Sequence, residues 1–266
     1  MRRLPLRNAA VCFVLLASSC VAAALDERWS CDTLGASRSL PVVADHMGDG
    51  QLHAFVTTRF DGTVWVAGHG GTSLHPYTYP YWLEGGIAAA VQPGAAAAVF
   101  AFQESAGNLN LCDYKAGETK QVAIGGEACI GTMPCFADLD GDRAFEIVLT
   151  RRNGIVTALD DTAAPLWQFD AGAPLDSSPA VATVRAADAA AAEQPSSMVY
   201  VVTTDGVLHA VSGAGLPQWR FRMDHAAPRF PSVADPLVVP LGGTGAAVVV
   251  SDVTGGLYAV DAVDGH

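Results

Sequence analysis

The feature that most constrains this chain is a repeated hairpin. Apolar, strand-like segments flank a glycine-containing turn at intervals of 45 to 52 residues, with the glycines at positions 62, 107, 154, 206 and 256. Asp-Gly and Asn-Gly between apolar runs favour a tight β-hairpin, because glycine adopts a positive φ without steric cost. A short apolar segment that begins at a proline precedes four of these hairpins, at Pro41, Pro134, Pro179 and Pro231. Each unit therefore predicts three successive strands.

Two units add a fourth strand that contains a tryptophan, Trp167 in one and Trp219 in the other. Each tryptophan precedes the proline of the next unit by 12 residues, and Trp29 precedes Pro41 by the same distance. Four strands per unit at this period are typical of a β-propeller, an all-β fold of four-stranded antiparallel blades. We expect five repeats. Because the last repeat stops before its tryptophan strand, we expect the N-terminal strand around Trp29 to complete it; a longer chain would add further blades.

Composition agrees with such a fold and limits the partners. The chain has 266 residues, of which 50% are hydrophobic and 16% charged, with 27 glycines and 15 prolines. Many turn residues between apolar runs are typical of a fold with many short strands. The formal net charge of −12 repels a phosphate backbone, so we do not expect nucleic acid as a partner.

One turn in the third unit stands out by its carboxylates. Asp138, Asp140, Asp142 and Glu146 occupy positions 1, 3, 5 and 9 of a loop that leads directly into the apolar residues 147–149. Alternating carboxylates on a tight turn can point to a common centre, whereas without a cation their like charges repel. The alternative is a solvated acidic turn between two strands.

This loop resembles the FG-GAP repeat of integrin α-chain propellers and related secreted proteins. Residues 154–167 and 206–219 are similar to PQQ-type propeller repeats. Both resemblances imply a propeller over nearly the whole chain after the N-terminal segment. They say little about function, because such propellers serve adhesion, scaffolding, assembly and, in long quinoproteins, catalysis.

The FG-GAP resemblance implies one calcium site in this loop. The implied ligands are Asp138, Asp140 and Asp142, the carbonyl of Ala144, and Glu146. An all-oxygen set suits Ca²⁺, and Gly141 lets the loop fold around the ion. The sequence departs from the family pattern at two positions, because Arg143 replaces a glycine and Glu146 replaces an aspartate.

The corresponding turns of the other units have fewer ligands. In the first unit Asp45 and Asp49 occupy positions 1 and 5, but Met47 and His53 stand at positions 3 and 9. Asp235 stands alone in the last unit. We therefore expect these turns to be structural.

Residues 1–24 are predicted to be a secretory signal peptide. Three arginines precede an apolar run that ends at Ala24, where small residues offer a cleavage site. The alternative is a sequence similar to a bacterial lipobox at Cys20, which would attach a lipid. No later apolar run reaches the roughly 18 residues of a membrane span. We expect residues 25–266 to form a single propeller domain in an extracellular, lumenal or periplasmic compartment. The alternative is that they form the N-terminal part of a longer propeller.

Four cysteines remain after this segment is removed, and an oxidising compartment favours their pairing. Four cysteines allow three connectivities. Cys129 and Cys135 are six residues apart, so a small disulfide loop is predicted there, and Cys31 would then pair with Cys112. The alternative is four small buried thiols.

The segment at residues 75–82 is rich in aromatic side chains. Tyr77, Tyr79 and Tyr81 alternate along it, and exposed tyrosines are good anchors for a protein or carbohydrate partner. Trp82 is interpreted as the fourth-strand tryptophan of the first unit, with an exposed partner-binding role as the alternative.

These features favour a module that is not an enzyme. No GxSxG, HExxH or phosphate-loop sequence occurs. The first hypothesis is a secreted or lumenal propeller that binds or scaffolds other macromolecules and is stabilised by one Ca²⁺. The alternatives are an envelope assembly lipoprotein anchored through Cys20 and, less favoured, a PQQ-dependent dehydrogenase. The adjacent cysteines that the dehydrogenase resemblance implies do not occur.

Overall fold

The computed structural model describes residues 40–58, 60–68, 74–125, 132–184, 196–223, 234–242 and 245–266. The chain divides into two units, residues 1–30 and 31–266, and all the described residues belong to the second. The predicted signal peptide lies outside the described residues, as do Cys20, Trp29, Cys31 and Cys129. In the described ranges we find no helix with the length and hydrophobicity needed to cross a membrane.

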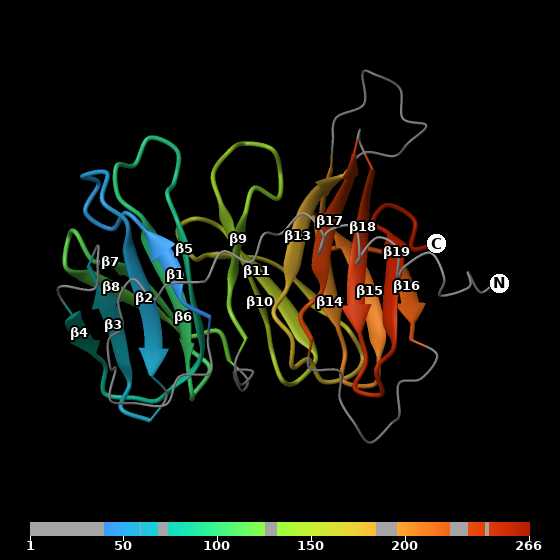
Figure 1. Cartoon of the computed structure of the whole chain (residues 1–266), viewed down its shortest axis with the longest axis horizontal. Helices are drawn as coiled ribbons and strands as arrows, with labels where there is room; N and C mark the ends of the chain where they lie inside the picture. The colour runs from blue at the N-terminus through green and yellow to red at the C-terminus, as the bar shows by residue number, and fades with distance from the viewer. Residues whose placement is uncertain are drawn as a thin grey trace, which may run out of the picture. The chain divides into compact units, whose positions relative to one another are not determined.

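The described strands form five antiparallel sheets, and the strands of each sheet follow one another in chain order (Figure 1). The first sheet contains β1 (Val42–Ala44), β2 (His53–Thr58), β3 (Thr63–Ala67) and β4 (Leu74–Thr78). The second contains β5 (Leu83–Ala90), β6 (Val99–Glu104), β7 (Leu109–Asp113) and β8 (Glu118–Val122). The third contains β9 (Cys135–Ala137), β10 (Glu146–Thr150), β11 (Ile155–Leu159) and β12 (Pro165–Asp170).

The fourth sheet contains β13 (Ala180–Val184), β14 (Ser196–Val202), β15 (Val207–Ser212) and β16 (Pro217–Arg222). The fifth contains three described strands, β17 (Leu237–Gly242), β18 (Gly245–Ser251) and β19 (Leu257–Asp261). Strand β5 contacts β1 and β9, and β13 contacts β9 and β17, so the first strands of successive sheets are neighbours. Each sheet is called a blade below. This arrangement is the predicted one.

The hairpins between the second and third strands form as predicted. The turn glycines at positions 62, 107, 154 and 206 have φ angles between 64° and 88°. In the last blade the glycine with positive φ is Gly255 rather than Gly256, at 92°. Only glycine adopts this conformation at little cost, which is why the turn glycines were a reliable guide to the repeat.

Two strand predictions were wrong. The first strand of the last blade was expected at residues 231–235, but β17 begins at Leu237. Asp235 instead lies before the strand, where its carboxylate accepts a hydrogen bond from the backbone N–H of Ser178 at 2.6 Å. Trp82 lies beyond β4 and is 52% exposed, so it is not a fourth-strand tryptophan. Its ring contacts that of Phe60, with the centroids 5.8 Å apart.

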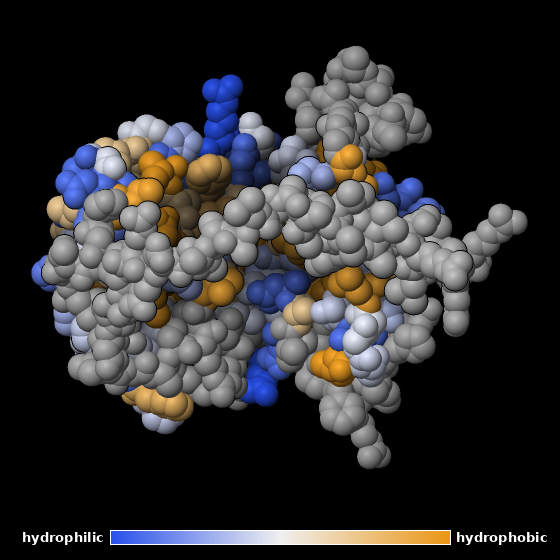
Figure 2. Space-filling view, viewed as in Figure 1, coloured by the Kyte–Doolittle hydropathy of each residue, from blue (hydrophilic) through white to orange (hydrophobic). Residues whose placement is uncertain are grey.

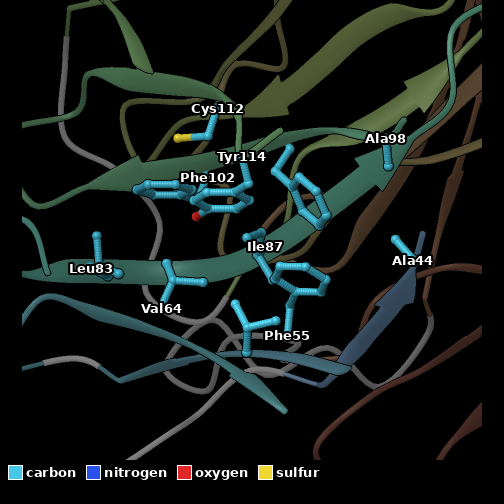
Figure 3. Packing of buried hydrophobic residues seen from close by; sticks show 11 residues of the cluster. Ala44, Phe55, Val64, Leu83, Ile87, Ala98, Phe102, Cys112 and Tyr114 are labelled. Carbon is cyan, nitrogen blue, oxygen red and sulfur yellow. The ribbon is translucent and has the colours of Figure 1, made fainter. Parts of the chain in front are cut away.

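The apolar side chains form a core between each pair of successive blades. Alternate residues of a strand face opposite sides of its sheet. In β14, Tyr200 and Val202 belong to the core shared with the fifth blade, whereas Val199 and Val201 belong to the core shared with the third. Figure 3 shows the core between the first two blades, where Phe55 and Val64 face Ile87 and Phe102. Because both faces of the inner strands are buried, these strands are almost wholly apolar.

Two tryptophans of the fourth strands also connect successive blades. The indole N–H of Trp167 donates to the carbonyl of Gly213 at 2.7 Å. A Cβ on Gly215 would lie 2.7 Å from this ring, and a Cβ on Gly265 would lie 2.7 Å from the ring of Trp219. Each tryptophan therefore packs on a glycine in the last turn of the following blade, where a side chain would prevent the contact. On the outer surface, polar and apolar residues are mixed (Figure 2).

The predicted disulfides stay predictions, because Cys31 and Cys129 lie outside the described residues. Cys112 and Cys135 are free thiols. Cys112 is buried in the first core, where its sulfur lies 3.2 Å from the hydroxyl of Tyr79 and accepts a hydrogen bond from Thr119 at 3.4 Å. Burial raises the pKa of the Cys135 thiol to about 11. Cys112 therefore serves as a packing group of the core, whereas Cys135 is half-buried.

Candidate metal centre

The acidic loop connects β9 to β10, and it brings three of the predicted ligands together. One carboxylate oxygen each of Asp138, Asp140 and Glu146 lies within 4.8 Å of the other two. This is the one group of three or more His, Cys, Asp or Glu side chains with such spacing in the described ranges. Three oxygens at this spacing can contact one cation, so the loop is a candidate metal centre.

Asp138 also holds the loop in its folded conformation. Its carboxylate accepts hydrogen bonds from the backbone N–H groups of Gly141 at 2.7 Å and Arg143 at 3.1 Å. The φ angles of these two residues are 89° and 79°. A positive φ is costly for arginine, which explains why the family pattern has glycine at this position.

Two of the implied ligands are not part of the group of three. Asp142 is exposed, and its carboxylate accepts a hydrogen bond from the backbone N–H of Ala144 at 2.7 Å. Asp140 in turn accepts one from the N–H of Asp142 at 3.1 Å. These short-range bonds stabilise the turn. The roles of Asp142 and Ala144 as ligands stay predictions.

Glu146 reaches the loop from the first position of β10 and is only 4% exposed. Its carboxylate accepts a hydrogen bond from the N–H of Leu139 at 2.6 Å. Burial raises the pKa of Glu146, and the nearby charges of Asp140 and Asp142 raise it further. A bound cation would offset this unfavourable environment of a buried carboxylate.

The neighbouring blades hold the acidic loop from both sides. The side-chain amide of Gln92 in the second blade donates to the carbonyl of Phe145 and accepts from its N–H, both at 2.8 Å. Ser197 in the fourth blade donates its hydroxyl to the carbonyl of Asp138 at 2.7 Å. No sequence pattern indicates this role of Gln92, because it is 53 residues from Phe145.

A groove of about 340 Å³ opens beside this loop. One wall is formed by Asp138, Leu139, Asp140 and Gly141, and the other includes the hydroxyl-bearing residues Thr183, Ser196, Ser197 and Ser212. The carboxylates of Asp138 and Asp140 are therefore accessible to water and ions from the space between the third and fourth blades.

The corresponding loop of the first blade has the same hydrogen bonds but a different set of side chains. Asp45 accepts from the N–H groups of Gly48 and Gly50, both at 2.7 Å. These bonds, with that from Gly50 as the largest cause, lower the pKa of Asp45. The ring of His53 stands perpendicular to that of His46, with the centroids 4.6 Å apart. These hydrogen bonds hold the loop in its turn, and the expectation that it binds no cation stays a prediction.

The three tyrosines proposed as partner anchors pack against the first core. Tyr77, Tyr79 and Tyr81 are half-buried. Tyr81 donates its hydroxyl to Asn110 at 2.6 Å, and the ring of Tyr77 lies 4.3 Å from that of Tyr114. Burial raises the pKa of Tyr81 to about 12. These residues connect the first two blades, and their contact with a partner stays a prediction.

Comparison with known proteins identifies the fold. No protein-family model and no curated protein sequence matches the chain. Among solved structures, the chain is similar to BBS1N in its complex with ARL6DN, with 14% identity and a TM-score of 0.54, over 84% of this chain and 68% of BBS1N. It is also similar to BamB from Moraxella catarrhalis, with 15% identity and a TM-score of 0.53, over 86% of this chain and 62% of BamB.

A third similar structure is the dihydro-heme d1 dehydrogenase NirN in complex with DHE, with 15% identity and a TM-score of 0.50, over 79% of this chain and 42% of NirN. The fold is a β-propeller. At these identities the likeness shows the fold alone, because one propeller architecture carries many unrelated functions.

Proposed function

We propose that this propeller is a non-catalytic binding or scaffold module of the secretory pathway, stabilised by one Ca²⁺ in the loop between β9 and β10. The observation that carries the proposal is the convergence of Asp138, Asp140 and Glu146 within 4.8 Å, on a loop fixed by both neighbouring blades. The FG-GAP resemblance of the same loop supports it.

The donor set fits calcium better than other common metal ions. All the candidate ligands are oxygens, which Ca²⁺ prefers, whereas Zn²⁺ and Cu²⁺ sites use imidazole or thiolate. Asp138, Asp140 and Glu146 would hold the ion, with Asp142 and the Ala144 carbonyl as further ligands. The nearly complete burial of Glu146 next to two aspartates also fits, because a divalent cation stabilises carboxylates in this position.

The bound ion would act on the fold and not on a substrate. The loop contacts residues from the blades on both sides, through Gln92 and Ser197. A cation that fixes this loop therefore also fixes the contact between three blades. An ion that binds only the folded state stabilises it by mass action, by about 2.7 kcal/mol at a concentration 100 times its Kd.

A macromolecular partner, protein or carbohydrate, is the other part of the proposal. The structure of BBS1N contains a second protein, ARL6DN, which supports a binding role for a propeller of similar fold. The predicted signal peptide supports an extracellular, lumenal or periplasmic location. The absence of a known catalytic sequence pattern supports a role other than catalysis.

Calorimetric titration with CaCl₂ tests the cation site. We expect saturable binding of one ion per chain to the wild type and none to Asp140→Ala, which removes the ligand oxygens. Asp161→Ala is the matched control, because Asp161 is exposed and lies outside the loop. Absence of binding to the wild type, or equal binding to Asp140→Ala, would refute the calcium site.

The PQQ-type resemblance favours a second candidate, an envelope assembly lipoprotein anchored through Cys20. Its support is the matching packing of Trp167 on Gly215 and Trp219 on Gly265, in the two repeats that resemble PQQ-type repeats. Mass spectrometry of the mature N-terminus separates the two candidates. A lipid on Cys20 establishes anchoring, and a chain that begins at Leu25 excludes it. A quinoprotein dehydrogenase is tested by PQQ reconstitution followed by dye reduction.

A further inference from the structure

The outer strand of the fourth blade differs in charge from the outer strand of the third. The two strands have closely related sequences, PLWQFD in β12 and PQWRFR in β16, with the same alternation of exposed and half-buried residues. Gln168 and Asp170 of β12 correspond to Arg220 and Arg222 of β16. On a chain with a formal net charge of −12, two adjacent exposed arginines on one face of a strand form a local basic surface.

Two grooves lie along this face of β16. The first, about 380 Å³, has Phe169 on the side of the third blade and His209, Gln218 and Arg220 on the side of the fourth. The second, about 270 Å³, is lined by Val207, Arg220 and Arg222. Arg220 lines both grooves. The first groove, with Phe169 and His209, is called the aromatic recess below.

Two rings in contact with each other line the aromatic recess. The ring of His209 contacts that of Phe169, with the centroids 5.7 Å apart. Burial, together with the charge of Arg220, lowers the pKa of His209. The imidazole is therefore neutral at neutral pH and adds apolar surface beside the phenyl ring. Asp170, at the edge of the recess, already accepts a hydrogen bond from the N–H of Gly172 at 2.8 Å.

The arginines are available for an anionic partner. In the described part of the chain, Arg220 makes no ion pair or side-chain hydrogen bond. Arg222 pairs with Asp205 at 3.1 Å, but both side chains are exposed, at 64% and 42%. An exposed ion pair contributes little to stability and exchanges readily. Arginine is also well suited to planar, bidentate contact with carboxylates.

Strand β16 is the edge of its sheet. It pairs with β15 on one side, and among the described strands it has no neighbour on the other. A free edge accepts an extended peptide through main-chain hydrogen bonds. Because β16 is basic, a second copy of the same edge would repel it, which disfavours pairing between two copies of this strand. An acidic strand has the complementary charge.

We propose that β16 is a docking edge for an extended acidic segment of a partner protein. The segment adds to the sheet as a further strand, places carboxylates on Arg220 and Arg222, and packs an apolar side chain in the groove lined by Phe169 and His209. This inference rests on the proposed function as a binding module and names the chemistry of the partner. The required pattern is two acidic residues in alternate positions, followed on the same face by an aromatic residue.

The test is fluorescence anisotropy of the full chain with a labelled peptide, Phe-Val-Glu-Val-Glu-Val-Phe, which has the required alternation in both strand directions. We expect saturable binding that weakens with added salt. A scrambled peptide, Phe-Phe-Glu-Glu-Val-Val-Val, has the same composition without the alternation and should bind about tenfold more weakly. Equal binding of the scrambled peptide, or no binding of either, would overturn strand addition at this edge.

Two variants locate the contact. Arg220→Glu reverses the charge at an exposed position and should weaken binding about tenfold. Gln168→Glu makes the corresponding change on β12 and should leave the Kd within about twofold. Hydrogen exchange gives an independent measurement, because the backbone amides of residues 217–222 should become protected when the peptide binds. Unchanged binding to Arg220→Glu would contradict the proposal.

Further measurements separate failure of this proposal from failure of the proposed function. Free glutamate at an equal carboxylate concentration should not displace the peptide; displacement would identify a small-molecule carboxylate site instead. If the peptide fails to bind while the chain still binds one Ca²⁺, the docking edge is refuted and the calcium-stabilised propeller stands. Peptide binding that persists in a chelator supports the docking edge independently of the cation.

Discussion

The loops at residues 45–53 and 138–146 have matching hydrogen bonds and different ligands. In both loops the aspartate at position 1 accepts N–H groups from positions 4 and 6, at distances of 2.7 to 3.1 Å. Both loops have positive φ at these positions, with Gly48 and Gly50 in one and Gly141 and Arg143 in the other. The turn itself therefore does not depend on a cation.

The two loops also contact the following blade in the same way. The carbonyl of Asp45 accepts from the N–H of Ala98 at 2.9 Å, and that of Asp138 accepts from the hydroxyl of Ser197 at 2.7 Å. The loops differ at positions 3 and 9, where Met47 and His53 stand in place of two acidic residues. The aspartate at position 1 thus folds the turn, and positions 3 and 9 decide whether the turn can bind a cation.

The largest effect is expected from loss of the first aspartate. Asp138→Ala removes two hydrogen bonds to a carboxylate and a cation ligand, so urea unfolding in calcium should show a loss of about 4 kcal/mol. The matched variant Asp45→Ala should lower the melting temperature equally with and without calcium. If the effect of Asp138→Ala is also independent of calcium, the difference between the loops is refuted.

The second expectation concerns transfer of the site between the loops. The double substitution Met47→Asp and His53→Glu gives the first loop the carboxylates of the third. Calorimetry should then detect two calcium ions per chain instead of one, and calcium saturation at 100 times the Kd should add about 2.7 kcal/mol of stability. The single variant Met47→Asp serves as the control. If the double variant does not bind a second ion, residues at other positions also cause the difference in calcium binding between the two loops.

A smaller effect is expected from the strained arginine. Arg143→Gly replaces a residue that adopts positive φ at a cost, so the protein without calcium should gain about 1 kcal/mol in urea unfolding. Gly50→Ala makes the opposite change in the first loop and should lose about 1 kcal/mol. A loss of stability in Arg143→Gly would show that its side chain has a stabilising contact that outweighs the strain.

The smallest effect is a difference in pH dependence, measured in a chelator. The pKa of Glu146 is raised, so its folded state binds the proton more tightly and its contribution falls as pH rises from about 4.3 through the folded pKa. The pKa of Asp45 is lowered, so its contribution is present above about pH 3.9 and is lost as pH falls through the folded pKa. Carboxyl ¹³C NMR titration measures both values. If the pKa values of Glu146 and Asp45 shift equally and in the same direction, the inferred difference between their environments is wrong.

The sequence predicted the blades well because each repeat is specified locally. Strand β11 begins and ends where the pattern placed it, since an Asn-Gly turn and a buried apolar run define both boundaries. The repeat pattern failed at two places. A proline was taken as the start of β17, and Trp82 was taken as the tryptophan of a fourth strand. The pattern also missed β8, whose residues ETKQV are nearly all exposed and show no apolar alternation.

The carboxylates of the candidate metal centre were predictable from the sequence, but the contacts that hold the loop were not. The spacing of Asp138, Asp140 and Glu146 is a local property, and the structure brings all three together. The hydrogen bonds from Gln92 and Ser197 to the acidic loop were not predictable, because these residues come from other blades. The burial of Cys112 in the core was not predictable, because the number and spacing of cysteines contain no information on burial.

The sequence by itself determined the fold class, the order of the strands and the position of the acidic turn. These depend on alternation, turn glycines and charge over a few residues, so they can be read from a short stretch of sequence. Only the tertiary structure decided which side chains from different blades meet. It packed Tyr77, Tyr79 and Tyr81 against a core, held the acidic loop between two neighbours, and set Arg220 in one groove with Phe169. Those contacts depend on how the sheets pack face to face, which no single repeat specifies.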